Sequence, residues 1–508
     1  MARQSVTALN NWANVSLEFC GRLLEDLLSI RDYFNRGAEL GPVVGLTAGA
    51  GDNHRQGRSV CILTFGSGLK LVYKPRPLSV DIHFQELLAW ANRHGADPGF
   101  LDVKVLDRGS YGWIEFVEAT PCRSKDEISR FYSRQGGYLA LLYVLRATDF
   151  HFENLIACGE HPVLIDLESL FHRSALESKS GDATSAGAQA MDDSVLSTGL
   201  LPFKLFTGAN QQDGIDMSGL GGAAGQLTPG PVSSWEDAGT DTMRFARKRM
   251  EMPACNNRPS LNGIEVNTFD YTREIVSGFT SMYRLLERDR DDLVSANGPL
   301  ERFAGDEVRC VLRPTWSYAR LLLESFHPNL LRNALNRDCL FDQLWRQVES
   351  RQVLKRAIEF EREDLQNGDI PMFTTRTDSH DISSSFGQVI ADVLEQPGLE
   401  LARERIRRLG ADDLSRQVWF IRSAMTALAL ESAEDYRTVS PVARKEPKAE
   451  ATRDRLMSAA CEVADRLQTL ALDGAHGEIS WIGLGLVGER HWTLATAGLD
   501  LYSGLSGI

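Results

Sequence analysis

The stretch that decides the fold is ATDFHFENLIACGEHPVLIDLESLFH, residues 147–172. Its apolar run VLI has the composition of a buried strand. Ionisable and amide side chains nevertheless flank that run closely. They are Asp149, His151, Asn154, Asp166 and Glu168. Burying a polar group costs free energy unless the group is paired with another or serves a function, so this stretch is a candidate functional site.

The spacing of these polar residues is typical of a phosphoryl-transfer site. Asn154 follows Asp149 by five positions, and Asp166 follows Asn154 by twelve, after the run VLI. Kinases use a catalytic-loop aspartate, a metal-binding asparagine and a further metal-binding aspartate. The order Asp-x-His-x-x-Asn is closer to lipid and atypical kinases than to the His-Arg-Asp version. Carboxylate and amide oxygens suit the Mg²⁺ that accompanies ATP, and apolar neighbours strengthen the field at the transferring group.

A kinase also needs a lysine on a strand upstream of the metal site. The runs SVCILTF and LKLVYKP, joined by GSG, predict a β-hairpin whose second strand carries Lys74. Glu86, on the helix predicted over Asp81–His94, is the expected partner that orients Lys74. The candidate phosphate-facing turn is GAGDNHRQGR, in which glycines let backbone amides approach phosphate oxygens. These glycines are Gly49, Gly51 and Gly57.

Each of these residues also has a purely structural interpretation. Taken alone, Asp149 is better explained as a helix cap and Asp166 as the start of a loop than as catalytic groups. Taken alone, Lys74 is explained equally well as a solvated strand lysine and as a functional one. All four groups, Asn154 included, occur in the kinase order with suitable gaps, and this favours the functional interpretation. His161 and His172 are expected to be structural.

Composition limits the classes of function. The chain has 508 residues and a net charge of -14, which argues against a nucleic-acid-binding surface. The longest interior apolar run found, LALLYVL at Leu139–Leu145, is too short to span a bilayer. The start lacks a signal-peptide core. The eight cysteines show no metal-ligand spacing, so we expect reduced thiols in a cytoplasmic protein and no zinc site.

The sequence predicts both helices and strands up to about residue 235, and mainly helices from about residue 265 onward. An amphipathic helix is predicted over residues 15–36, and a longer one over Glu127–Leu145. Residues 173–193 are small and polar and predict a mobile loop. The final LDLYSGLSGI has no polar tail, which suggests that a longer protein is cut here.

Several long motifs resemble the dehydratase domain of class II lanthipeptide synthetases, the LanM-type enzymes. The residues that carry this resemblance are GDNHRQGRSVCILTFGSGLKLVYKPRPLSVDIHFQELLAW, YGWIEFVEATPC, TDFHFENLIACGEHPVLIDLESLFH, SVLSTGLLP, DMSGLGG, NRPSLNG and RCVLRPTWSYARLL. They extend over essentially the whole chain from about residue 40. The terminal DLYSGLSGI is similar to the opening of the family's cyclase domain.

The resemblance implies an α+β fold with a lipid-kinase-like bilobal core and a large, mostly helical additional region. The implied domains are an N-terminal helical segment (1–40), the kinase-like core (41–235), the helical region (236–480) and the start of a cyclase domain (481–508). The implied activity uses ATP and Mg²⁺ to phosphorylate Ser and Thr of a ribosomal precursor peptide that carries a leader. Phosphate is then eliminated, which leaves dehydroalanine or dehydrobutyrine.

Family roles transfer to matching positions. Lys74 corresponds to the phosphate-binding lysine, and Asp149, with His151 beside it, to the catalytic-loop aspartate. Asn154 and Asp166 correspond to the magnesium ligands, and Glu168 lies at the same site. The residues that correspond to the elimination group are Asp52, His54, Arg309 and Thr315, with Arg313 as a rival for the arginine.

Two other classes of function stay open at this point. The catalytic loop alone does not name an acceptor, so a lipid or small-molecule kinase is the second enzymatic hypothesis. An inactive, truncated peptide-binding scaffold is the third, although the presence of Lys74, Asn154 and Asp166 counts against it. Without the resemblance, Arg309 reads as a surface residue and Thr315 as a helix cap. The group that removes the proton during elimination is not identified by the sequence.

Overall fold

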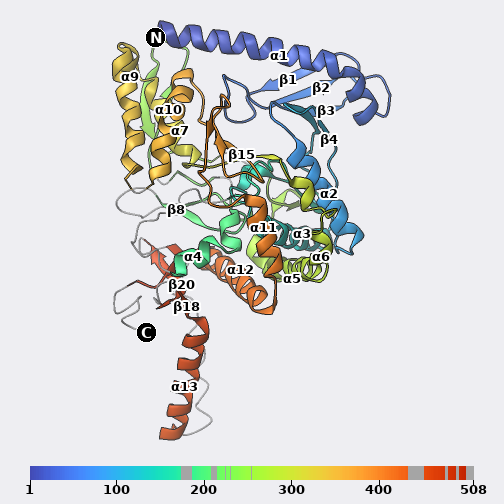
Figure 1. Ribbon diagram of the computed structural model, residues 1–508, viewed down its shortest axis with the longest axis vertical. Coiled ribbons are helices and arrows are strands. Elements are labelled where there is room, and N and C mark those ends of the chain that lie inside the picture. Colours follow the sequence, from blue (N-terminus) through green and yellow to red (C-terminus); the bar gives the residue numbers. More distant parts are fainter. Residues whose placement is uncertain are drawn as a thin grey trace.

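The computed structural model describes residues 1–172, 186–206, 214–223, 225–228, 230–252, 255–349, 351–432, 451–474, 479–487 and 491–498. In Figure 1 the long helix α1 (Ala2–Phe34) crosses one end of the molecule, and α13 (Arg453–Leu470) projects from the other end. Helices and antiparallel sheets fill the body between them. The buried apolar residues form three main clusters: one beneath α1, one in the middle and one in the unit of helices α7–α10 (residues 315–367).

An antiparallel sheet lies beneath α1 and carries the predicted hairpin. Its strand order is β1-β2-β3-β5-β4. The hairpin is confirmed, since β2 pairs with β3 from Cys61↔Tyr73 to Thr64↔Lys70. Alternate residues of β2 are buried, as period-two alternation predicts for a strand with one face in a core. The bounds are β1 Val43–Ala48, β2 Cys61–Phe65, β3 Lys70–Lys74, β4 Val105–Asp107 and β5 Gly112–Glu115.

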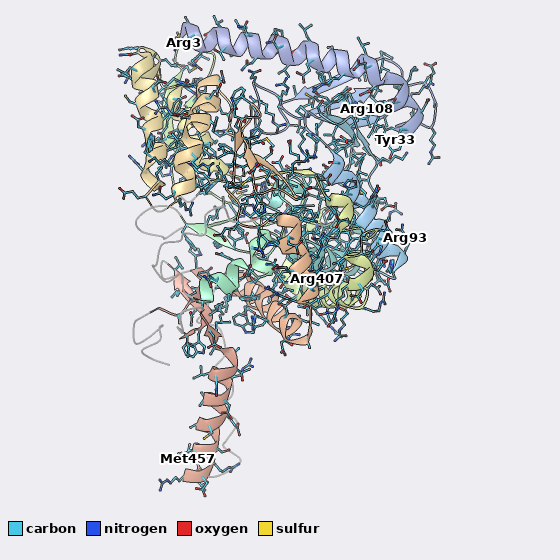
Figure 2. All side chains as sticks on the ribbon, viewed as in Figure 1. Arg3, Tyr33, Arg93, Arg108, Arg407 and Met457 are labelled. Atoms are coloured by element: carbon cyan, nitrogen blue, oxygen red, sulfur yellow. The ribbon has the colours of Figure 1, made fainter. Side chains whose placement is uncertain are left out.

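Helix α1 is fastened to this sheet by a buried carboxylate. Asp26 accepts hydrogen bonds from Trp113 Nε1 and Arg108 Nε, both at 2.8 Å. The other end of α1 reaches the α7–α10 unit, where Gln4 donates to the carbonyl of Gln366. Figure 2 labels residues near the two ends of this helix. The helix starts well before the predicted 15–36. The prediction missed its first turns because they expose their apolar side chains and have no clear buried stripe.

The central core is built around a close crossing of two helices, α3 (Lys125–Val144) and α5 (Thr272–Arg288). Glycines make this approach possible. A Cβ on Gly136 would lie 2.0 Å from the carbonyl oxygen of Ile275, and one on Gly278 would lie 1.8 Å from that of Ser133. The segment 147–172 follows α3 directly and is held on this core. Helices α2 (Ser79–Arg93), α11 (Gly398–Arg407) and α12 (Ala411–Ser432) complete it.

The region predicted as mostly helical contains a four-stranded antiparallel sheet as well as helices. Its strands are β14 (Glu307–Arg309), β15 (Thr374–Arg376), β16 (Ile382–Ser383) and β17 (Val389–Ile390). Helices α7–α10 pack beside it with a core of their own. Their bounds are α7 Thr315–Ser325, α8 Pro328–Leu331, α9 Ala334–Phe341 and α10 Gln352–Asn367.

Part of the predicted loop 173–193 is helical, since α4 spans Ala186–Asp192. Alanines dominate that end, and alanine has the highest helix propensity. Residues 173–185 lie outside the described residues. The expected cyclase start at 481–508 coincides in part with a hairpin of β20 (Ile482–Val487) and β21 (His491–Thr496). Residues 499–508 also lie outside the described residues, so the cyclase boundary stays a prediction.

The remaining elements are shorter, apart from α13. Figure 2 places Met457 of α13 far from the body, and no residue of this helix is buried. No helix in the described ranges is long and apolar enough to cross a membrane. The other bounds are α6 Arg290–Leu293, β6 Leu155–Cys158, β7 His161–Leu164, β8 Lys204–Phe206, β9 Gly214–Asp216, β10 Val232–Glu236, β11 Arg244–Lys248, β12 Ser260–Leu261, β13 Ile264–Glu265, β18 Leu472–Asp473 and β19 Ile479–Ser480. The 3₁₀ turns are Phe152–Asn154, Val195–Thr198, Thr268–Tyr271, Glu301–Phe303 and Asp342–Gln347.

The α3–α5 crossing gives a test of the fold. Gly278→Ala should lower the free energy of unfolding by about 2 kcal/mol or more, because the new methyl group meets backbone that cannot move aside. Gly21→Ala is the matched control, since a Cβ there meets nothing within 4 Å. It should raise stability by roughly 0.5–1 kcal/mol through helix propensity. Urea denaturation followed by circular dichroism measures both, and equal effects of the two substitutions would contradict the close crossing.

Candidate functional site

A cleft of about 1000 Å³ lies where three segments meet. The sheet beneath α1 supplies one wall, the stretch that follows α3 supplies the floor, and β14 with the start of α7 supplies the opposite wall. The candidate residues that line the cleft are Asp52, His54, Lys74, Asp149, His151, Asn154, Asp166, Glu168, Arg309 and Thr315. The site residues predicted from the sequence are therefore brought together, with the exceptions given below.

Lys74 reaches the floor from the last position of β3. Its side chain is buried, and Nζ donates to the carbonyl of Ile165 at 2.5 Å. Ile165 directly precedes Asp166, so the lysine and that aspartate face one cavity. The nearest carboxylate is that of Asp81, whose Oδ1 lies 3.9 Å from Nζ. An ammonium group held at the end of a strand, facing a cleft, suits the binding of an anionic phosphate.

Asp149 and Asn154 are held together by a tight local turn. Asp149 adopts a left-handed backbone conformation, with φ of 66°, which is uncommon outside glycine but tolerated by aspartate. Asn154 Nδ2 donates to the carbonyl of Asp149 at 2.9 Å. Burial raises the pKa of Asp149 above its usual value, and the nearby His151 and Arg309 offset this only in part. The turn thus places a carboxylate and an amide side by side at the end of the floor.

Arg76 joins the acidic residues of the cleft and was not predicted from the sequence. Its guanidinium donates to Asp81 Oδ2 at 2.8 Å and to Asp166 Oδ1 at 3.2 Å, and its Nε lies 3.7 Å from Glu168 Oε2. Burial alone would lower the pKa of Arg76, but these carboxylates outweigh burial and raise it. Its position two residues after Lys74, in the same motif, was the signal that could have identified it.

Arg309, Glu168 and Thr315 form a second group at the opposite wall. Arg309 donates from Nη1 to Glu168 Oε1 and from Nη2 to Thr315 Oγ1, both at 2.8 Å. The backbone amide of Arg309 also donates to the carbonyl of Glu168 at 2.7 Å. Burial would raise the pKa of Glu168, but Arg309 and Arg76 lower it to about 2. Glu168 is therefore an ionised residue clamped between two guanidinium groups.

The position of Glu168 bears on its predicted role as a metal ligand. Both of its oxygens face guanidinium groups. Across the described ranges, no three His, Cys, Asp or Glu side chains come together as a metal site. Mg²⁺ is usually held by only one or two carboxylates, with waters and substrate phosphates completing the shell. Asp166 and Asn154 fit that requirement, and Glu168 fits an ion-pair role better.

His54 faces the same cleft from the loop that follows β1. Its Nδ1 lies 2.7 Å from the carbonyl oxygen of Ile370, a bond that a protonated Nδ1 makes as the donor. Burial, followed by the charge of Arg309, lowers the pKa of His54 although Glu168 acts in the opposite direction. A neutral ring with its proton on Nδ1 carries its free lone pair on Nε2. Asp52 lines the cleft two residues earlier.

Two expectations from the sequence are wrong in the structure. Glu86 does not orient Lys74, because it is an exposed residue that pairs with Arg302 at 3.0 Å. Asp81 and Gln85, four residues apart on α2, face the cleft, and Glu86 is turned about 100° further round the helix. The amide of Gly57 faces Asp369 rather than the cleft, although Gly49 and Gly51 do line it.

Arg313, the rival of Arg309, is also excluded by its contacts. It lies in the core of the α7–α10 unit, where its Nε donates to Glu361 at 2.8 Å. Tyr318 donates to the same carboxylate at 2.6 Å. Of the two candidate arginines, Arg309 lines the cleft and Arg313 does not. His161 and His172, expected to be structural, are not among the residues that line it.

With this geometry established, the chain can be compared with known proteins. The model of a family described as a domain of unknown function, DUF4135, matches residues 1–376. The chain belongs to the DUF4135 family. All of the cleft residues named above lie within the matched part of this DUF4135 chain.

The chain is similar to a curated protein, the lacticin 481/lactococcin biosynthesis protein LcnDR2 of Lactococcus lactis subsp. lactis. It is 27% identical over 475 residues, which cover 90% of the DUF4135 chain and 49% of LcnDR2. The chain therefore spans about half the length of this relative. The match confirms the resemblance to class II lanthipeptide biosynthesis proteins that the motifs indicate.

The two candidate partners of Lys74 can be separated by their effect on stability. Asp81→Asn should lower the free energy of unfolding by roughly 3 kcal/mol, because it removes the carboxylate that lies nearest to both Arg76 and Lys74, two buried cations. Glu86→Gln should leave it nearly unchanged, since exposed ion pairs contribute little. Urea denaturation compares the variants, and a larger loss for Glu86→Gln would contradict this arrangement.

Proposed function

We propose that this protein is a lanthipeptide dehydratase. It uses ATP to phosphorylate Ser and Thr hydroxyls of a ribosomal precursor peptide, and it then eliminates phosphate to give dehydroalanine or dehydrobutyrine. The observation that carries the proposal is that two residue groups line one cleft: the first is Lys74, Asn154 and Asp166, and the second is His54 and Arg309. The relation to a lacticin 481/lactococcin biosynthesis protein supports the choice of a lanthipeptide precursor as the substrate.

Phosphoryl transfer would use the half of the cleft nearest the β1–β5 sheet, which we propose is the smaller lobe of a lipid-kinase-like core. Lys74 would pair with the ATP phosphates. Asn154 and Asp166 would hold Mg²⁺, which when bound neutralises charge on the transferring group. Asp149 would orient the peptide hydroxyl and accept its proton, a role that its raised pKa favours. The fit for Mg²⁺ rests on the donor set, one amide and one carboxylate at the end of the floor.

Elimination would use Arg309 and Thr315 of the opposite wall together with His54 of the loop that follows β1. A base removes the proton from the α-carbon, the electron pair forms the Cα=Cβ bond, and the Cβ–O bond breaks as phosphate leaves. His54 is the base that the contacts favour, because its Nδ1 proton is engaged by Ile370 and Nε2 is then the acceptor. Arg309, held by Thr315, would pair with the departing phosphate and stabilise its charge.

The proposal is tested by following the mass of the cognate precursor peptide with ATP and Mg²⁺. Loss of water supports the dehydratase, a retained phosphate indicates a kinase alone, and an unchanged mass contradicts the proposal. Lys74→Ala should reduce phosphorylation by about 10²-fold or more, whereas Lys70→Ala, at the half-exposed start of the same strand, should not. Arg309→Ala should let phosphopeptide accumulate, and the exposed Arg302→Ala serves as its control.

The pH dependence of elimination gives a second prediction. Because burial lowers the pKa of His54 below its ordinary 6.5, the ring is neutral at pH 7 and can accept a proton. Elimination from a preformed phosphopeptide should therefore stay constant as pH falls from 8 to 6.5 and decline only below that. A rate already falling between pH 8 and 7 would exclude His54 as the base. Supplying the phosphopeptide removes the phosphorylation step from the measurement.

A further inference from the structure

The loop that carries Asp52 and His54 ends in an unusual backbone turn. Three successive residues, Arg55, Gln56 and Gly57, have φ values of 48°, 69° and 84°. Residues other than glycine rarely adopt this left-handed region, and such conformations persist only where surrounding contacts enforce them. Something outside the loop must therefore hold residues 53–57 in place.

The holding group is the carboxylate of Asp369. Its Oδ2 accepts the amide of Gln56 at 2.6 Å, and its Oδ1 accepts the amide of Gly57 at 2.9 Å. Asp369 is buried, and it stands directly after α10 and its left-handed C-cap, Gly368. Successive amides in such a turn form a concave site for an anion. Here that site is filled by a side chain from a distant part of the chain.

The residue next to Asp369 completes the clamp and reaches His54. The amide of Ile370 donates to the carbonyl of Asn53 at 2.9 Å, and the carbonyl of Ile370 lies 2.7 Å from His54 Nδ1. Two adjacent residues thus fix both the backbone on each side of His54 and the orientation of its ring. The hydrogen bond to one ring nitrogen decides which nitrogen carries the proton.

We propose that Asp369 is a positioning residue for the elimination step. By holding the turn at residues 53–57 against Ile370, it keeps the His54 proton on Nδ1 and keeps Nε2 basic toward the cleft. This inference rests on the proposed function for its catalytic consequence. The groups assigned to phosphoryl transfer are fixed by other contacts, namely Lys74 by Ile165 and Asn154 by Asp149. A defect at Asp369 should therefore separate the two reactions.

The first test uses Asp369→Asn in the full chain. The substitution replaces one acceptor oxygen with a donor that faces a backbone amide, so the turn loosens. Elimination from a preformed phosphopeptide should fall by about 10²-fold, the cost typical of a small misplacement, while phosphorylation by ATP changes by less than about 3-fold. Asp381→Asn is the matched control, because Asp381 Oδ1 also accepts one backbone amide, that of Asp392 at 2.8 Å, in the same region. The control should leave both rates unchanged.

The second test does not depend on activity. Nuclear magnetic resonance of protein with ¹⁵N-labelled histidine, assigned with His54→Gln, reports which ring nitrogen carries the proton. We expect the Nδ1–H form in the wild type and a mixture in Asp369→Asn.

An unchanged tautomer together with unchanged elimination would overturn the positioning role. A proportional loss of both reactions, with a lowered melting temperature, would also overturn it in favour of a general structural role. If the wild type processes no peptide, the proposed function fails, and the tautomer measurement still decides the contact between Asp369 and His54.

Discussion

The buried ion pairs among Arg76, Glu168 and Arg309 are the constraint on which the rest of the structure depends. Guanidinium groups are always charged, so an arginine removed from water requires carboxylates at close range. Arg76 meets this requirement through Asp81, Asp166 and Glu168, and Arg309 meets it through Glu168. These contacts tie together α2, the stretch after β7 and β14. These ion pairs join segments that line the cleft.

The sequence predicted the local elements and the membership of the site better than it predicted the contacts. Two β-prone runs joined by a glycine turn predicted the β2–β3 hairpin, and helical spacing of apolar residues predicted α2 and α3, because these signals lie within short windows. Spacing along residues 149–166, together with the family motifs, predicted the residues that line the cleft. It did not predict which side chain faces Lys74, since Asp81 and Glu86 differ only in their position around one helix.

Long-range pairing was beyond what the sequence could predict. Nothing in the composition of 236–480 indicated that β14, three residues long, pairs with β15 and brings Arg309 to the cleft. Arg309 and Arg313 looked equivalent because they stand four positions apart in one motif, and only the partner Glu361 assigns Arg313 to a core. Likewise, the glycines of the loop before β2 resembled a phosphate cradle. The acidic group that occupies part of it, Asp369, lies more than 300 residues further along the chain.

Helix α1 has a mechanical consequence for the cleft. Near one end, Asp26 accepts a hydrogen bond from Trp113 of the β1–β5 sheet, and near the other end Gln4 donates one to α10. An α-helix resists stretching, because lengthening it breaks backbone hydrogen bonds. Such a strut fixes the separation between the sheet and the helical unit on that side of the molecule. The cleft would then widen by rotation of the two walls about this strut, or by rearrangement of loops at its mouth, and not by a parallel separation of the walls.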